Sequence, residues 1–127
     1  PTPSSDNPAP MLAAKVDGLL SRVCKILNMW PKKPQQLRIY LLKNGREVRQ
    51  RQLALQPFLQ EGSFWEDDSL EGLYDPLTRS IYLSLKDLRV GILAHEMTHY
   101  VLNEAFAVPP PASVQEHWAH YVERQVD

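Results

Sequence analysis

Residues 94–100 read Ala-His-Glu-Met-Thr-His-Tyr and contain the pattern H-E-x-x-H. Side chains four positions apart on an α-helix lie on one face, so His95 and His99 can present their imidazole rings to a single ion. Glu96 lies about 100° around the helix from His95, where its carboxylate can hold a water without joining the ligands. The pattern predicts a zinc site in which Glu96 is the general base. The alternative interpretation is a solvated helix face carrying two histidines and a glutamate.

The composition favours a single globular domain. A chain of 127 residues in which 43% are hydrophobic has enough apolar side chains for one core. The 14 basic and 15 acidic residues nearly cancel, so the chain lacks the positive charge that accompanies most nucleic-acid binding. It has no apolar run of about 18 residues. We therefore expect no nucleic-acid partner and no transmembrane segment, and the oligomeric state stays open.

Residues 1–10 are rich in proline and serine, which predicts a disordered tether ahead of one domain spanning residues 11–127. Such a tether often follows a removed export signal, so an exported location is one hypothesis. Cys24 is the only cysteine and cannot form a disulfide within the chain. We interpret it as a small core residue.

The chain before the motif shows helical and strand patterns in turn. Apolar residues recur every three or four positions over residues 11–29, and residues 46–55 predict a second, polar-faced helix. Branched and aromatic residues predict strands over 37–42, 70–74 and 80–83, and a turn at 75–79 joins the last two. The segment 58–70 is acidic and irregular. These elements predict an α+β fold with a small, mostly antiparallel sheet.

The motif helix is predicted to begin at Ser84, because Asp87 lies in the capping-box position. Its apolar side chains are expected in the core: Leu85, Leu88, Ile92, Leu93, Val101 and Leu102. Gly91 lowers helix propensity and indicates close packing one turn before the motif. Gly72 marks either a bulge in its strand or the close approach of another chain. The prolines at 109–111 end this helix. A last helix is predicted over 114–125, with a buried stripe of Val114, Trp118, Tyr121 and Val122.

A catalytic zinc typically has three protein ligands and an open position, so the motif needs a third ligand. Glu104 lies too far around the motif helix to reach the ion. Glu116 and His120 are four positions apart and share one face of the last helix, so both are candidates, whereas His117 points into solvent. Glu116 has a further interpretation as the capping-box partner of Ser113, without a metal.

Several segments together resemble the small gluzincin metallopeptidases, or minigluzincins. They read Gly-Leu-Tyr-Asp-Pro at 72–76, Ile-Tyr-Leu at 81–83, Leu-Ala-His-Glu-Met-Thr-His at 93–99, Pro-Pro at 110–111 and Gln-Glu-His-Trp-Ala-His-Tyr-Val-Glu at 115–123. The family commonly follows H-E-x-x-H with a helix reading roughly E-G-x-A-x-Y, so the resemblance implies that Glu116 is the third ligand. Here His117 stands for the usual glycine, and His120 for an acidic residue that supports a zinc-bound imidazole. We expect His120 to accept a hydrogen bond from that imidazole, with direct metal binding as the alternative.

The resemblance implies a zincin-like active-site helix, a C-terminal ligand-bearing helix and a zinc-dependent metallopeptidase. His95, His99 and Glu116 would bind Zn²⁺, and Glu96 would move a proton from the activated water to the leaving amine. A peptide or protein substrate would pair with the strand around residues 79–83. The alternative is a catalytically inactive metal-binding domain that acts as a protein-interaction module.

Overall fold

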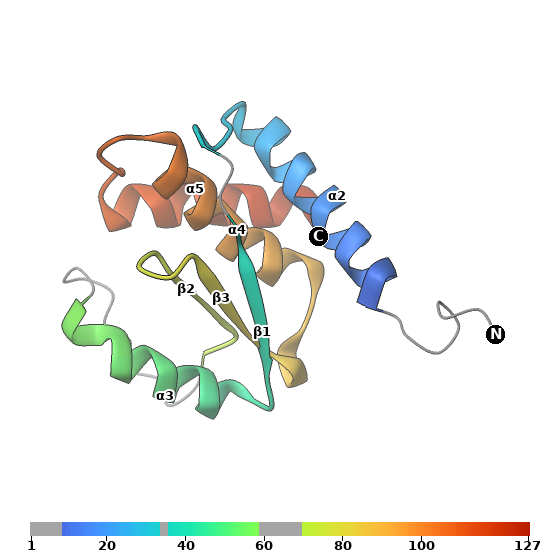
Figure 1. Cartoon of the computed structure of the whole chain (residues 1–127), viewed down its shortest axis with the longest axis vertical. Helices are drawn as coiled ribbons and strands as arrows, with labels where there is room; N and C mark the ends of the chain where they lie inside the picture. Colours follow the sequence, from blue (N-terminus) through green and yellow to red (C-terminus); the bar gives the residue numbers. More distant parts are fainter. Residues whose placement is uncertain (1–8, 34–35, 59–69) are drawn as a thin grey trace.

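The structure, a computed structural model, describes residues 9–33, 36–58 and 70–127 (Figure 1). Within these ranges it contains four α-helices, which are α2 (Ala9–Leu27), α3 (Gly45–Leu55), α4 (Val90–Ala105) and α5 (Ala112–Val126). The strands are β1 (Arg38–Leu42), β2 (Gly72–Asp75) and β3 (Ser80–Ser84), and short 3-10 turns span Gln56–Phe58 and Leu85–Asp87. The predicted α+β class is confirmed.

The three strands form a mixed sheet in the order β1-β3-β2. β3 is parallel to β1 and antiparallel to β2, so the expectation of a mostly antiparallel sheet needs correction. The tight turn after β2 makes β3 its neighbour, and β1 pairs with the other side of β3. Because β3 is hydrogen-bonded on both sides, the edge predicted around residues 79–83 for a substrate strand does not exist.

The sheet lies between two helical layers (Figure 1). On one face, α3 covers a small core made by Val48, Leu73 and Tyr82. On the other face, α4 packs on β2 and β3 and against α2 and α5. The main core there includes Val23, Cys24, Tyr74, Ile81, Leu83, Met97, Tyr100, Val101 and Val122. Ile81 is completely buried, and its burial contributes about 2 kcal/mol of hydrophobic stabilisation. Cys24 is also buried, which confirms its prediction as a core residue.

Helix α2 begins two residues earlier than predicted. Ala9 and Pro10 belong to the helix rather than to the tether, because proline is tolerated in a first turn, where its missing N–H has no intrahelical partner. The helix ends at Leu27, and Asn28 follows with a left-handed φ of 55°, as is common after a helix. Residues 1–8 of the predicted tether and 59–69 of the acidic segment lie outside the described residues.

Helix α4 begins later than predicted, at Val90 rather than Ser84. The Ser84 hydroxyl donates a hydrogen bond to Asp87 Oδ2 (2.8 Å) and starts only a 3-10 turn. Arg89 is extended and forms the N-cap of α4. Leu85 and Leu88 therefore precede the helix and are exposed, contrary to prediction, whereas the later apolar positions Ile92, Val101 and Leu102 are buried.

Helix α5 begins at Ala112, with Pro111 at its N-cap. Its buried residues are Gln115, Ala119 and Val122. Of the predicted stripe only Val122 is buried, whereas Val114, Trp118 and Tyr121 are exposed. The helix face that carries the small Ala119 packs against the neighbouring helices, whereas the face that carries Trp118 is exposed.

None of the helices in the described ranges has both the length and the hydropathy needed to cross a lipid bilayer.

Candidate metal centre

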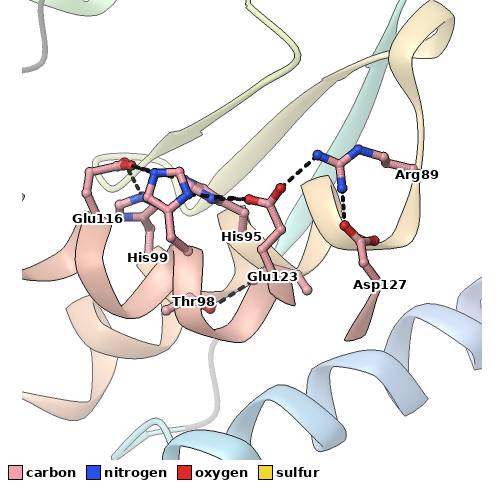
Figure 2. Close-up of polar contacts among 9 residues, drawn as sticks. Arg89, His95, Thr98, His99, Glu116, Glu123 and Asp127 are labelled. Carbon is pink, nitrogen blue, oxygen red and sulfur yellow. Dashed lines mark hydrogen bonds and ion pairs between the residues drawn. The ribbon is translucent and has the colours of Figure 1, made fainter. Parts of the chain in front are cut away.

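Helices α4 and α5 bring His95, His99 and Glu116 together (Figure 2). His99 Nε2 lies 2.9 Å from Glu116 Oε1, and His95 Nε2 lies 3.3 Å from Glu116 Oε2. The side chains of the two histidines are only 12% and 15% exposed. The three side chains that the sequence assigned to one ion thus converge, with both Nε2 atoms directed at the same carboxylate. The capping-box interpretation of Glu116 is wrong, because no side chain caps α5.

The Nδ1 atoms of the two histidines are held by other residues of α5. His95 Nδ1 lies 2.8 Å from Glu123 Oε1 (Figure 2), and His99 Nδ1 lies 3.0 Å from Gln115 Oε1. The Gln115 Nε2 donates to the Pro110 carbonyl at 2.9 Å, which leaves its oxygen to face His99. Both acceptors favour the tautomer with the proton on Nδ1. Both Nε2 atoms face Glu116, so a ring that also carries a proton on Nε2 donates it to this carboxylate, and a bound cation would take the place of that proton.

Sequence reasoning missed both supporting residues. Glu123 lies seven positions after Glu116, two turns along the same helix face, and that spacing was a usable signal. Gln115 had no comparable signal, because its position depends on how α5 is rotated against α4. The Nδ1 of His95 has Glu123 Oε1 as its partner at 2.8 Å, and the supporting role expected of His120 stays a prediction.

Arg89 holds Glu123 from the start of α4. Its Nη2 donates to Glu123 Oε2 at 2.7 Å, and its Nη1 contacts the Asp127 carboxylate (Figure 2). A Cβ atom at Gly91 would clash with Asp127, so the close packing predicted before the motif is confirmed. The arrangement links the N-terminus of α4 to the C-terminal end of α5 on the side of His95.

Glu96 is buried between α4 and the sheet, with 7% of its surface exposed. A Cβ atom at Gly72 of β2 would lie 3.1 Å from Glu96 Oε2, so the close approach at Gly72 is made by this side chain. Burial raises the pKa of Glu96, while the charges of His95 and His99 lower it, and the net effect is a raised pKa. A carboxylate with a raised pKa binds a proton more readily, which suits a general base.

Gly72→Val is expected to displace the Glu96 carboxylate, because the added methyl groups occupy the space that it fills. If Glu96 is the general base that the sequence predicts, peptide hydrolysis should fall by about 10- to 100-fold, with the affinity for added zinc unchanged. Isothermal titration with zinc and a peptide-cleavage assay on the same preparation check this. Hydrolysis at the wild-type rate would show that Glu96 does not depend on Gly72.

The site concentrates negative charge around its imidazoles. Burial of His95 opposes protonation, but hydrogen bonding to Glu116 and the charge of Glu96 outweigh burial and raise its pKa to about 9. Burial would raise the pKa of Glu116, but its contacts with His95 and His99 lower it well below the usual range. With Glu123 on the far side, three carboxyl groups surround the pair of rings. Such surroundings favour a bound cation.

The remaining candidates occupy distinct positions. His120 is exposed, and its Nε2 lies 3.4 Å from Glu116 Oε2. His117 is exposed, as predicted. Glu104 lies 3.2 Å from Arg79 in an ion pair, consistent with its exclusion as a ligand.

Comparisons of this chain with models of known protein families, with curated proteins and with solved structures find no match.

Proposed function

We propose that the chain is a zinc-dependent metallopeptidase. The observation that carries the proposal is the convergence of His95 Nε2, His99 Nε2 and the Glu116 carboxylate, with both Nδ1 atoms engaged elsewhere. Two ligand atoms of a tetrahedral zinc lie about 3.3–3.6 Å apart. The spacings of 2.9 and 3.3 Å join Nε2 atoms to carboxylate oxygens and are hydrogen-bond contacts at or below that value. Two imidazoles with one carboxylate are a common catalytic zinc set, so the chemistry of these donors supports zinc.

Glu96 is the proposed general base and acid. When bound, zinc would lower the pKa of a water and polarise the scissile carbonyl. The Glu96 carboxylate accepts a proton from the attacking water and delivers it to the nitrogen of the leaving amine. Its burial and raised pKa support this role. Glu123 orients His95, and Gln115 orients His99, in each case through the Nδ1 atom of the histidine.

The substrate is proposed to be an extended peptide that pairs with β2. Among the described residues, β2 has a strand partner on one side only. The Ser84 N–H donates to the Glu71 carbonyl, so in this antiparallel ladder the backbone groups of Gly72 and Tyr74 point away from β3. A peptide that adds to this edge would run beside Gly72, against which Glu96 packs.

The second candidate is a catalytically inactive metal-binding domain that acts as a protein-interaction module. The outer face of α5 favours it, because Val114, Trp118 and Tyr121 are each more than a third exposed. Exposed aromatic side chains are enriched at protein interfaces. Hydrolysis separates the two candidates.

The test is hydrolysis of a mixed peptide library by the zinc-loaded full chain, with products identified by mass spectrometry. We expect cleavage that a chelator removes and that added zinc restores. A zinc-loaded chain that cleaves no peptide contradicts the peptidase and supports the interaction module. Cleavage that persists in the chelator contradicts the zinc dependence.

A further inference from the structure

We propose that His120 supplies a fourth protein ligand to the zinc, so that the ion lies in a closed site until a substrate displaces this histidine. The inference rests on the proposed zinc site. Its starting observation is that three imidazoles converge on one carboxylate. The Nε2 atoms of His99, His95 and His120 lie 2.9, 3.3 and 3.4 Å from the oxygens of Glu116.

Each of the two facing helices offers a pair of ligands one turn apart. His95 and His99 are four positions apart on α4, and Glu116 and His120 are four positions apart on α5. The donor atoms of His95, Glu116 and His120 all lie within 4.8 Å of one another. The 3.4 Å between His120 Nε2 and Glu116 Oε2 also matches the separation of about 3.3–3.6 Å for two ligands of one tetrahedral zinc. The donors of His95, Glu116 and His120 are thus close enough to share one ion, and His99 contacts the same carboxylate.

The supporting role expected of His120 has a second candidate here. Glu123 already accepts the hydrogen bond from His95 Nδ1 at 2.8 Å, so His120 is not needed to orient that ring. The His120 ring lies beside His95, with the ring centres 4.8 Å apart. Its remaining polar contact through Nε2 is with Glu116, itself a proposed ligand.

The exposure of His120 makes it a displaceable ligand. Its side chain is 57% exposed, whereas those of His95 and His99 are 12% and 15% exposed. Its Nδ1 lies 3.8 Å from Glu123 Oε1, which is beyond hydrogen-bond distance. Rotation of the His120 side chain would therefore open the position that a catalytic zinc leaves for water or substrate.

The test uses the cobalt(II)-substituted full chain, because cobalt(II) absorbs visible light according to its ligands and geometry. Azide is the probe for an open coordination position. We expect azide to change the spectrum of His120→Ala and to leave the wild-type spectrum unchanged. Zinc affinity of His120→Ala should also fall by at least about 10-fold. His117→Ala, a matched exposed histidine on the same helix, should behave as the wild type does.

His120→Gln separates a ligand from a hydrogen-bonding neighbour, because glutamine keeps a donor for Glu116 but lacks the imidazole. If His120 is a ligand, this variant binds azide as His120→Ala does. Wild-type protein that holds cobalt(II) and binds azide as tightly as His120→Ala does overturns the inference while leaving the open zinc site of the proposed function intact. His120→Gln that retains the wild-type spectrum and resists azide also overturns it. A wild-type chain that binds neither zinc nor cobalt(II) at this site contradicts both proposals.

Discussion

Glu116→Ala is expected to release zinc as effectively as His99→Ala, although the two residues lie on different helices. Each replacement leaves the ion with one fewer protein donor and leaves a partner side chain without its contact at 2.9 Å. We expect the zinc dissociation constant to rise by more than about 100-fold in both variants. Replacing a residue that only hydrogen-bonds a ligand raises this constant by less. Competition with a fluorescent chelator measures it.

Glu104→Ala is the matched control for that comparison. Glu104 is also a partly buried glutamate in an ion pair, but its partner is Arg79. Its removal should leave zinc affinity within about 3-fold of the wild type, because outer-shell effects are confined to side chains that touch the ligands. Unchanged zinc retention in Glu116→Ala would remove Glu116 from the ligand set.

Glu96→Ala is expected to reduce zinc-dependent peptide hydrolysis by about 10²- to 10⁴-fold, the usual contribution of a general base. The side chain is separate from the proposed ligands, so zinc content should stay at the wild-type level. Glu96→Gln keeps the volume beside Gly72 but accepts no proton, and should lose as much activity. Single-turnover cleavage of a peptide found in the library measures both variants.

Three outcomes distinguish the parts of this second prediction. Loss of activity in Glu96→Gln with zinc retained assigns the effect to proton transfer rather than to packing against Gly72. Zinc-dependent cleavage by Glu96→Ala at the wild-type rate would contradict the role of this residue. Cleavage by both variants that ignores chelation would identify a contaminating peptidase.

The sequence allowed local features of the site to be predicted because helical spacing is a local rule. His95 and His99 share a face of α4 at four-residue spacing, and the structure brings them together with Glu116, seventeen positions after His99. The position of Glu116 opposite the histidines was implied by resemblance and by the need for a third ligand. Its assignment as a ligand stays a prediction.

Features that depend on how elements pack could not be predicted in the same way. Strand patterns at β1, β2 and β3 do not determine their order, so the parallel pairing of β1 with β3 was missed. The rotation of α5 was also predicted wrongly, because Trp118 and Tyr121 were expected in the core, where the structure has the small Ala119. That rotation decides which polar side chains reach α4. Gln115 could be identified only once that rotation was known, whereas the spacing of Glu123 from Glu116 was a usable signal.

The start of α4 shows a different limit of sequence reasoning. Ser84 and Asp87 have the residue types of a helix start, but their side chains bond to each other. The helix begins only after Arg89, whose side chain reaches Glu123 and Asp127 (Figure 2). A longer helix would have carried Arg89 within it, whereas the extended backbone at the N-cap presents the guanidinium to α5.

The central claim is that one zinc ion binds between α4 and α5. Anomalous diffraction at the zinc absorption edge, from crystals of the zinc-loaded full chain, tests it most directly. We predict one strong peak about 2.0–2.2 Å from His95 Nε2, His99 Nε2 and a Glu116 carboxylate oxygen. A crystal of the zinc-loaded chain with no peak between these three side chains, or with its zinc held elsewhere, would contradict the account.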